Sequence, residues 1–421
     1  MRPLLISSIC LALAPLSHAA DGFKAFSFRA IPGGAATAVR PDAVYSEASG
    51  FGFEPATAGS ADGSANFTSN PKPFLFSVAL PEGNYHVDVT FGDAADASVT
   101  TVKAECRRLM LENVAVAKGA SITRSFTVNI RTPAIAGGDP VKLKPREKDS
   151  LHWDNRLTLE FSGARPAVQS LTIAPATNAV TLFLLGDSTV TDQPREPFNS
   201  WGQMLTQFFK PGLAVANYAE SGESLRSSRG ARRLAKVLSV IRPGDVAFIQ
   251  FGHNDQKEKG EGIGAFTSYK TDLKHYVAEL RKRGGQPVPV TSVQRRNFNA
   301  EGRIVSNLGD YPEAVRQVAR EESVPLIDLH AMSKPLYEAL EAHGKDYSKK
   351  AFAPGDNTHH NNYGSYQLAK CIVEGIKAAK LDVAKFLVDD FAAFDPAKPD
   401  PVDGFKVPTS PVATALKLDG N

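Results

Sequence analysis

The sequence predicts a mixed α/β protein in two parts, an all-β region followed by an α/β region built on a parallel sheet. Apolar and polar residues alternate with a period of two in the first part, whereas apolar runs alternate with helical patterns in the second. The chain has 421 residues, which is too long for a single hydrophobic core, so we expect more than one domain. We predict a signal peptide at 1–20, a β-sandwich at 21–175, an α/β domain at 176–392 and an irregular, proline-rich tail at 393–421.

The first 20 residues have the pattern of a secretory signal peptide. Arg2 provides the basic start, residues 4–16 the apolar stretch, and Ala19 or Ala20 the small residue at the cleavage point. The apolar stretch is too short to span a bilayer, and no later stretch is long and apolar enough to do so. We therefore expect a secreted or periplasmic protein without a membrane span.

The β-region is predicted from three alternating segments, at 85–91, 126–130 and 157–161. Such alternation places one face of each strand on a core and the other in water. Turn signals separate the segments, for example at 81–84 and 137–140, and no long helical pattern interrupts them. These features are typical of a β-sandwich.

The α/β region begins after a short linker at 174–179. Its expected strands are 180–185, 214–218, 246–251, 288–293 and 324–327. Its expected helices are 200–209, 229–241, 265–283, 310–321 and 362–379. Strands that alternate with helices in this way predict a parallel sheet covered by helices on both faces, a three-layer α/β/α domain.

Composition narrows the possible partners. The chain is 42% hydrophobic and 22% charged, with a net charge of +3, so the concentrated positive charge that nucleic acid requires is not expected. Cys10 belongs to the predicted signal peptide. Cys106 and Cys371 fall in different predicted domains, and we expect two buried free thiols rather than a bridge between domains. The sequence gives no indication of the oligomeric state.

A serine and an aspartate–histidine pair carry the predicted chemistry. Ser188 comes just after the apolar run 180–185, in the turn Gly186-Asp187-Ser188, so its hydroxyl should lie at the carboxyl edge of the sheet, where open α/β sheets bind ligands. A hydroxyl needs a base to take its proton, and His359 is the candidate. Asp356, three residues earlier, can hold the other ring nitrogen. The predicted catalytic residues are Ser188, Asp356 and His359.

Attack on an ester creates an oxyanion, which needs hydrogen-bond donors aimed at it in advance. The backbone N–H groups of Ser188 and Gly222 and the side-chain amide of Asn254 are the predicted donors. Gly222 lies in a strand-ending block, and glycine permits a close approach of the backbone. Asn254 follows the apolar run 246–251 in a similar position.

Four further residues are candidates for substrate binding: Arg195, His253, Arg226 and His360. The arginines could bind a carboxylate with two parallel hydrogen bonds, although each could also be an ordinary solvated charge. His360 could compete with His359 as the base, but the Asp-x-x-His spacing favours His359. A metal site on Asp356, His359 and His360 lacks the usual ligand spacing. We therefore expect neither a metal nor an organic cofactor.

The four blocks together resemble a known family. They read Gly186-Asp187-Ser188, Asn217-Tyr218-Ala219-Glu220-Ser221-Gly222-Glu223-Ser224, Gly252-His253-Asn254-Asp255 and Asp356-Asn357-Thr358-His359. This pattern resembles the SGNH, or GDSL-like, hydrolases, and is most similar to the rhamnogalacturonan acetylesterases of carbohydrate esterase family twelve.

The resemblance implies a flavodoxin-like hydrolase domain preceded by a galactose-binding-like β-domain. It also implies a nucleophile at Ser188, oxyanion donors at Gly222 and Asn254, and the Asp356–His359 pair.

The expected function is removal of acetyl groups from acetylated plant cell-wall polysaccharide, rhamnogalacturonan or pectin, by a serine carboxylic ester hydrolase. This substrate is implied by the resemblance, because the residues alone indicate only a serine esterase. Two alternatives stay open: an esterase of the same scaffold acting on acetylxylan or a lipid ester, and an inactive hydrolase domain in a carbohydrate-binding protein. The complete set of five catalytic-type residues argues against the second.

Overall fold

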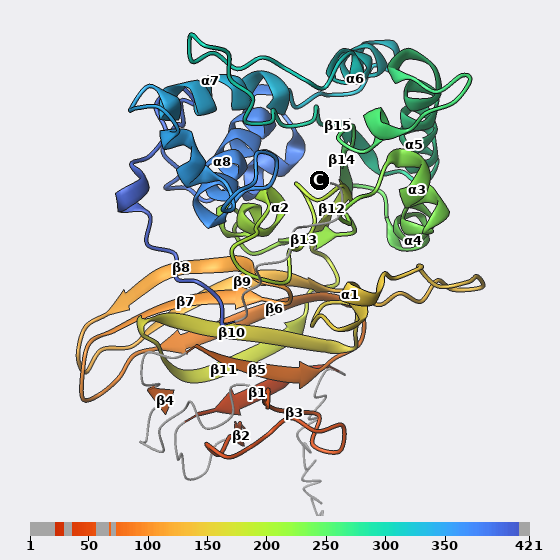
Figure 1. Ribbon diagram of the computed structural model, residues 1–421. Helices are drawn as coiled ribbons and strands as arrows, with labels where there is room; N and C mark the ends of the chain where they lie inside the picture. The colour runs from red at the N-terminus through yellow and green to blue at the C-terminus, as the bar shows by residue number, and fades with distance from the viewer. Residues whose placement is uncertain (1–21, 29–35, 56–66, 69–72, 412–421) are drawn as a thin grey trace, which may run out of the picture.

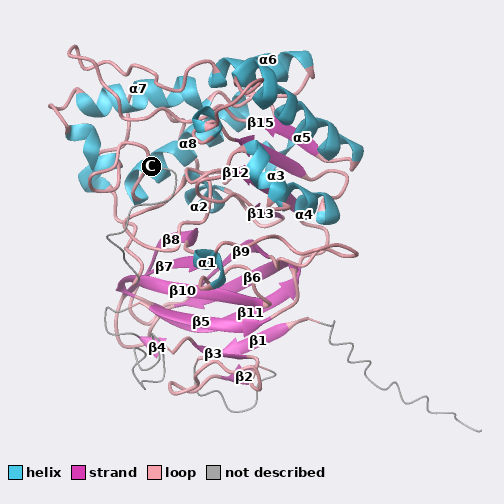
Figure 2. Ribbon diagram, turned by 45° about the vertical axis from the view of Figure 1, so that its right-hand side comes forward, coloured by secondary structure: helices cyan, strands magenta, loops and turns pink. Residues whose placement is uncertain are grey.

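The structure is a computed structural model that describes residues 22–28, 36–55, 67–68 and 73–411. The predicted signal peptide and the last ten residues of the predicted tail lie outside these ranges. The described residues form two stacked regions, with the strand-rich region below and the α/β region above (Figure 1). Figure 2 shows that the long helices gather in the upper region. The chain passes from one region to the other between Pro175, where the last lower strand ends, and Val180.

Two sheets form the lower region. One has the order β2-β1-β11-β6-β9, with β4 paired to β11, and the other has the order β3-β5-β10-β7-β8. Apolar side chains from both sheets, such as Phe76, Val87 and Phe161, share one buried core. The elements are β1 (Lys24–Ser27), β2 (Thr37–Ala38), β3 (Phe51–Phe53), β4 (Phe67–Thr68), β5 (Phe74–Ala79), β6 (Gly83–Phe91), β7 (Ser98–Ala104), β8 (Arg108–Val116), β9 (Ile122–Ile130), a short helix α1 (Pro145–Lys148), β10 (Arg156–Arg165) and β11 (Ala167–Pro175).

One expectation about these strands is wrong. β6 alternates as predicted, but both faces of β10 are buried, as are both faces of β9 over 126–130. Lys103 and Glu160, on the outer face of this sheet, pair at 3.2 Å and are at most 5% exposed. The Lys103 ammonium also donates to the Pro408 carbonyl at 2.7 Å and to Ser410 Oγ at 2.8 Å. The described part of the predicted tail therefore folds back and covers the lower region, which period-two alternation could not indicate.

The upper region contains a parallel sheet of order β13-β12-β14-β15. The predicted fifth strand at 324–327 forms only a single bridge, between Val290 and Ile327. The strands are β12 (Val180–Gly186), β13 (Leu213–Asn217), β14 (Val246–Gln250) and β15 (Gln286–Pro289). Leu182 and Leu184 face one core and Phe183 and Leu185 face another, so both faces of β12 are buried. This explains its continuous apolar run.

Helices cover both faces of this sheet (Figure 2). They are α2 (Trp201–Met204), α3 (Leu225–Gly230), α4 (Arg233–Val240), α5 (Lys270–Lys282), α6 (Tyr311–Glu321), α7 (Leu329–Glu341) and α8 (Asn362–Ala378). Short helical turns are η1 (Leu205–Phe208), η2 (Asp255–Lys257), η3 (Ala265–Tyr269), η4 (Tyr347–Ala351), η5 (Asp382–Phe386) and η6 (Val402–Gly404). α7 was not predicted. It contains Pro335, which normally ends a helix, and it is retained because Leu336, Tyr337 and Leu340 pack in the α8 core.

The lower region packs against one edge of the parallel sheet. β13 is the edge strand and lies next to β9 (Figure 1). Arg108 Nη1 donates to the Val215 carbonyl at 3.1 Å, and the N–H of Gly212 donates to Thr127 Oγ1 at 3.0 Å. Edge strands otherwise present unpaired backbone groups, so these contacts both protect the edge and fix the position of the two regions.

A buried carboxylate joins the two regions. Asp192 lies just after Ser188 and is 2% exposed. Its carboxylate accepts from Arg108 Nε at 2.8 Å, from Arg131 Nη2 at 3.2 Å and from Asn217 Nδ2 at 2.9 Å. Burial alone would raise the pKa of Asp192, but the neighbouring arginines and His152 hold it well below its usual range. Asp192 is therefore an anion that both arginines require.

We predict that Asp192→Asn destabilises the protein by about 3–5 kcal/mol, because it leaves two buried guanidinium groups without a compensating charge. Denaturant unfolding measures the effect. The matched control is Asp139→Asn, since Asp139 pairs with Arg232 on the surface and is 72% exposed. We expect the control to change stability by less than about 1 kcal/mol. Equal effects of the two substitutions would contradict a central role for Asp192.

Cys106 and Cys371 are both free and buried, as predicted. Burial raises the pKa of both thiols above the usual range. In the described ranges, no helix combines the length and the apolar character needed to cross a membrane.

Candidate active site

The serine of the first block lies on a tight turn at the carboxyl end of β12. The Asp187 carbonyl accepts from the N–H groups of Val190 and Thr191, both at 3.0 Å. Asp187 Oδ1 accepts from the backbone and hydroxyl of Thr189, each at 2.9 Å. Gly186 has no room for a side chain, since a Cβ there would lie 2.7 Å from the Gln250 carbonyl. The turn is thus rigid, and Ser188 is 3% exposed at its tip.

The three predicted catalytic side chains lie in one hydrogen-bonded row. Ser188 Oγ is 2.7 Å from His359 Nε2, and His359 Nδ1 is 2.9 Å from Asp356 Oδ2. Asp356 Oδ1 also accepts from the backbone N–H groups of Thr358 and His359 at 2.7 and 2.9 Å. Burial would raise the pKa of Asp356, but the hydrogen bonds from His359 and Thr358 keep it well below its usual range. An ionised carboxylate places the proton of the imidazole on Nδ1 and leaves Nε2 to accept from the serine.

The loop that carries His359 is fixed to the loop that follows the serine. The N–H of Asn199 donates to the His360 carbonyl at 2.9 Å, and Ala353 donates to the His359 carbonyl at 3.0 Å. The Phe198 ring meets the His359 ring edge to face at 6.2 Å between centroids. The serine–histidine distance is therefore set by two loops that support each other.

The predicted oxyanion donors Ser188, Gly222 and Asn254 follow three strands that lie side by side, β12, β13 and β14. Gly222 has a φ of +76°, in the left-handed region that favours glycine. Across the described ranges, no acceptor takes the backbone N–H of Ser188 or of Gly222. One N–H of the Asn254 amide donates to the Glu223 carbonyl at 3.1 Å, which leaves the other N–H for a ligand. Three donors are thus available.

The four candidate substrate-binding residues occupy different environments. Arg195 is exposed on the loop after the serine, and Arg226 is 48% exposed, 3.9 Å from the carboxylates of Glu258 and Asp272. His253 is buried, with Nδ1 3.1 Å from Asp187 and Nε2 3.0 Å from the Val293 carbonyl. Both of its ring nitrogens are occupied, so His253 has none left for a substrate.

His360 is also buried, and its Nε2 has a partner within the protein. It is 1% exposed, its Nε2 lies 2.6 Å from the Tyr337 hydroxyl, and its ring packs on Phe352 at 4.5 Å. Burial, with the adjacent His359, lowers its pKa to about 3, so it stays neutral. In place of the expected substrate contacts, we propose that His253 and His360 support the site.

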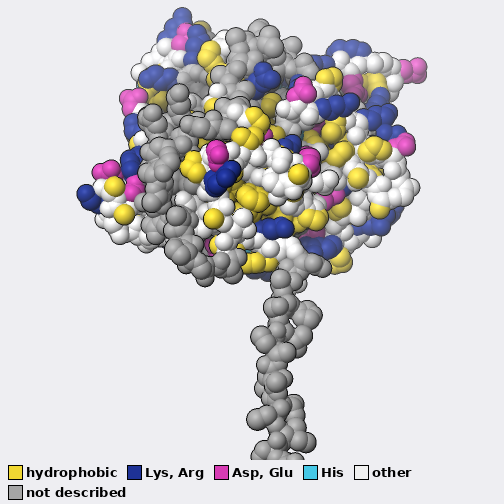
Figure 3. Space-filling model, turned by 90° about the horizontal axis from the view of Figure 1, so that it is seen from below, with side chains coloured by type: hydrophobic (Ala, Val, Ile, Leu, Met, Phe, Trp, Pro, Cys, Tyr) yellow, Lys and Arg dark blue, Asp and Glu magenta, His cyan; other side chains and the backbone are white. Residues whose placement is uncertain are grey.

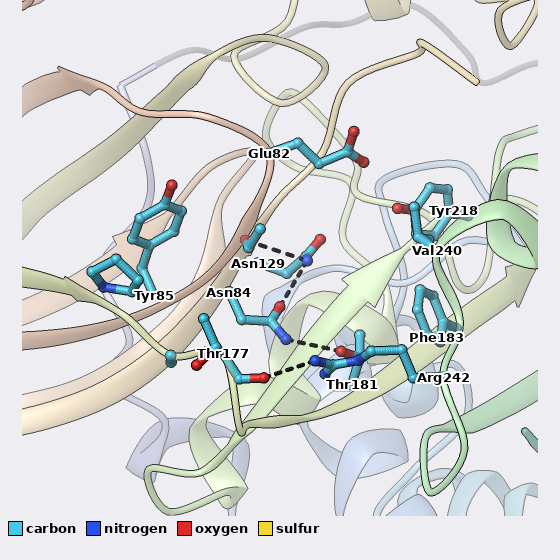
Figure 4. A pocket seen from close by; sticks show the side chains of 13 residues that line it. Glu82, Asn84, Tyr85, Asn129, Thr177, Thr181, Phe183, Tyr218, Val240 and Arg242 are labelled. Carbon is cyan, nitrogen blue, oxygen red and sulfur yellow. Dashed lines mark hydrogen bonds between the residues drawn. The ribbon is translucent and has the colours of Figure 1, made fainter. Parts of the chain in front are cut away.

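A cavity of about 390 Å³ lies elsewhere, at the amino ends of the strands, between the two regions (Figure 4). Asn84 Nδ2 donates to Thr181 Oγ1 at 2.8 Å and Asn129 Nδ2 donates to Asn84 Oδ1 at 2.8 Å, which links the regions across it. Arg242 on its wall donates to the carbonyls of Thr177 and Ala179. Since α/β sheets bind ligands at the carboxyl edge, this cavity is separate from the candidate active site.

Two residues that support the candidate site, Gln193 and Arg107, were not identified from the sequence. Gln193 Nε2 donates to the Ser188 carbonyl at 2.7 Å and to Ser221 Oγ at 3.2 Å, so it connects the serine turn to the second block, residues 217–224. Arg107, from the lower region, donates to the carbonyls of Gln193 and Phe198 at 3.0 and 2.7 Å. Neither residue belongs to a motif, and no local signal could have identified it. In the part of the chain that the structure describes, no cluster of three or more His, Cys, Asp or Glu side chains could hold a metal.

The α/β sheet and the polar blocks at its edge, together with similarity to known proteins, define a carboxylic ester hydrolase. The chain belongs to the GDSL-like lipase/acylhydrolase family, whose model matches residues 184–366. Within this family it is an SGNH hydrolase close to the rhamnogalacturonan acetylesterases.

Several known proteins are similar to this chain. Rhamnogalacturonan acetylesterase RhgT of Bacillus subtilis (strain 168) is 40% identical over 224 residues, which cover 50% of this chain and 94% of the relative. The probable rhamnogalacturonan acetylesterase YesY of the same organism is 34% identical over 214 residues, covering 50% and 98%. The solved structure of Bacillus subtilis YxiM has 24% identity and a TM-score of 0.47, with 86% of this chain and 99% of that chain covered.

Asp255, next to Asn254, has a carboxyl group with an unusual environment. Burial raises its pKa from 3.8 to about 7. Oδ1 accepts from the N–H of Leu225 at 2.9 Å, whereas the buried Oδ2 has no hydrogen-bond partner among the described residues. Between these two pKa values the folded state retains a proton that the unfolded state releases. The stability contributed by this group is therefore complete below pH 3.8 and is lost as the pH rises through about 7.

We predict that Asp255→Asn reduces the loss of stability between about pH 5 and about pH 8. The difference from the wild type should be about 2 kcal/mol, because one unit of pKa shift corresponds to about 1.4 kcal/mol. Urea midpoints at both pH values measure it, and Asp390→Asn, at an exposed position, is the control. The same pH dependence in wild type and Asp255→Asn would show that Asp255 does not titrate in this range.

Proposed function

We propose that this protein is a serine esterase that removes acetyl groups from rhamnogalacturonan, a pectin. The observation that carries the proposal is the row formed by Ser188, His359 and Asp356, with heavy-atom distances of 2.7 and 2.9 Å. The names of the relatives RhgT and YesY support the choice of substrate.

In the first half of the proposed reaction, Ser188 Oγ attacks the acetyl carbonyl while His359 Nε2 takes the hydroxyl proton. Asp356 stabilises the imidazolium that forms. The carbonyl oxygen becomes an oxyanion, which accepts from the N–H groups of Ser188 and Gly222 and from the Asn254 amide. His359 then gives its proton to the sugar oxygen, the bond from the acetyl carbon to that oxygen breaks, and the deacetylated sugar leaves.

In the second half, a water molecule hydrolyses the acetyl group on Ser188. His359 takes a proton from the water, whose oxygen attacks the acetyl carbon, and a second oxyanion occupies the same three donors. His359 then gives the proton to Ser188 Oγ as the bond from the acetyl carbon to Oγ breaks, and acetic acid leaves and releases its proton to solvent as acetate. None of these steps needs a metal or an organic cofactor.

Rhamnogalacturonan carries galacturonate carboxylates, and an arginine fork binds a carboxylate with two parallel hydrogen bonds. Arg195 is exposed on the loop after the serine, so we propose it as a carboxylate-binding residue. Arg226 is a weaker candidate, because Glu258 and Asp272 already neutralise much of its charge.

We further propose that residues 21–175 form an accessory domain of the galactose-binding type and that residues 176–392 form the catalytic domain. The lower region carries a mixture of basic and acidic side chains, which suits an accessory domain that contacts a polymer of neutral or mixed charge. In the described part of its lower face, basic, acidic and apolar side chains are interspersed (Figure 3). We also propose that the protein is secreted or periplasmic, with cleavage near Ala19 or Ala20, as the amino-terminal pattern indicates.

We predict that Ser188→Ala lowers acetate release from acetylated rhamnogalacturonan by at least about 10³-fold, because the nucleophile is lost. The fold should be unchanged, as measured by circular dichroism. The exposed Ser306→Ala serves as the control and should retain wild-type activity. A fluorophosphonate probe should label the wild type and not Ser188→Ala. Full activity in Ser188→Ala would reject the proposed mechanism.

We predict that Asp356→Asn lowers kcat by about 10³ to 10⁴-fold. An amide NH₂ facing His359 Nδ1 would move the ring proton to Nε2, which could then no longer accept from Ser188. Steady-state kinetics measures the loss, with Asp390→Asn as the control. Wild-type kcat in Asp356→Asn would exclude this role for the carboxylate.

The substrate is tested by comparing acetylated rhamnogalacturonan, acetylated xylan and a long-chain ester. We expect the highest kcat/KM on rhamnogalacturonan. Preference for xylan or for the long-chain ester would retain the esterase chemistry and replace the substrate, whereas no turnover and no probe labelling would indicate an inactive carbohydrate-binding protein.

A further inference from the structure

Two cationic side chains of the lower region bind the backbone next to Gly222, the candidate oxyanion donor. Lys144 Nζ donates to the Ser221 carbonyl, and Arg146 Nη2 donates to the same oxygen at 2.7 Å. Both residues flank the start of α1, 77 and 75 residues earlier in the chain. Ser221 is 1% exposed, so bulk water has little access to it. The Ser221 carbonyl therefore has two charged donors in a buried place.

The position of this carbonyl determines the direction of the neighbouring N–H. The Ser221 C=O and the Gly222 N–H belong to one planar peptide unit, in which they point in opposite directions. Donors that hold the oxygen on one side consequently aim the N–H to the other side. They also polarise the peptide, and hydrogen bonds in such a chain strengthen one another. Charged donors have the largest effect.

Buried ion pairs around α1 fix the position of these two side chains. Arg146 Nε donates to Glu220 Oε1 at 2.6 Å. On the other side of α1, Glu147 forms two bonds with Arg233, at 3.0 and 2.7 Å, and Arg233 Nε donates to Glu223 at 2.8 Å. Glu147 is 2% exposed and Arg233 is fully buried. The residues before and after the Ser221–Gly222 peptide are thus both tied to α1.

We propose that Lys144 and Arg146 are positioning residues for the esterase reaction, and that the lower region in this way forms the back of the oxyanion hole. They act through the Ser221–Gly222 peptide and need not touch the substrate. The inference rests on the proposed Ser188–His359 chemistry, but it does not depend on which polysaccharide is cleaved.

Lys144→Met tests the proposal with the least disturbance, because it removes one donor to Ser221 and leaves no buried carboxylate without its arginine. Lys148→Met is the matched control, since Lys148 is an exposed lysine on the same helix. With p-nitrophenyl acetate, we expect Lys144→Met to lower kcat about tenfold with KM within about twofold, because the oxyanion forms only in the transition state. Lys148→Met should match the wild type.

A second substrate separates positioning of the N–H from general damage to the site. In p-nitrophenyl thionoacetate, sulfur replaces the carbonyl oxygen and accepts hydrogen bonds poorly. The wild-type preference for the oxygen ester should therefore fall about tenfold in Lys144→Met and stay constant in Lys148→Met. Displacement of Ser188 or His359 would slow both esters equally and leave the preference unchanged. Arg146→Met should behave like Lys144→Met; if it fails to fold, Lys144→Met alone decides.

An unchanged preference in a folded Lys144→Met, or a raised KM with unchanged kcat, would overturn the proposal. Failure of the proposed function gives a different result. A wild type that hydrolyses p-nitrophenyl acetate but not acetylated rhamnogalacturonan would change the substrate only. A wild type with neither activity would remove the chemistry on which the positioning role rests.

Discussion

The buried carboxylate of Asp192 is the constraint on which the rest of this structure depends. It lies four residues after Ser188, and its charge is balanced by Arg108 and Arg131 from the other region. Buried charges are costly unless they are paired, so the two regions can separate only at a large energetic cost. Once Asp192 is held, the loop that follows it is held as well, and Arg107 completes the support at Gln193 and Phe198.

This arrangement makes the proposed active site depend on both regions. The proposed nucleophile and oxyanion donors follow strands of the parallel sheet, and the proposed base lies in the loop before α8. The loops that orient them contact the lower region in two places. Arg108 and Arg131 bind Asp192, and Arg146 of α1 donates to the Ser221 carbonyl. The β-region therefore contributes to the geometry of the site whether or not it binds sugar, and the folded tail secured at Lys103 reinforces the same joint.

Local patterns predicted a large part of the fold. The run 180–185 became β12, and the alternation at 85–91 lies within β6, because both follow from which faces are buried. α7 was missed because Pro335 is a local signal against a helix that only packing on α8 overrides. The outer face of β10 was expected in water because the tail that covers it is distant in sequence. The internal hydrogen bonds of His253 and His360 were not expected, because the partners of a buried ring cannot be derived from its adjacency to a motif.

The sequence by itself determined which chemical groups stand at the sheet edge and in what order, since each of the first three blocks follows an apolar run that must end as a buried strand. It also determined that Asp356 can reach His359, because three residues of loop suffice to bring the carboxylate to the ring. Only the tertiary structure decided which charged residues of the β-region support the site. Lys144 and Arg146 have no motif, and an ion–dipole contact depends on distance in space, which hydrophobic periodicity does not encode across 75 residues.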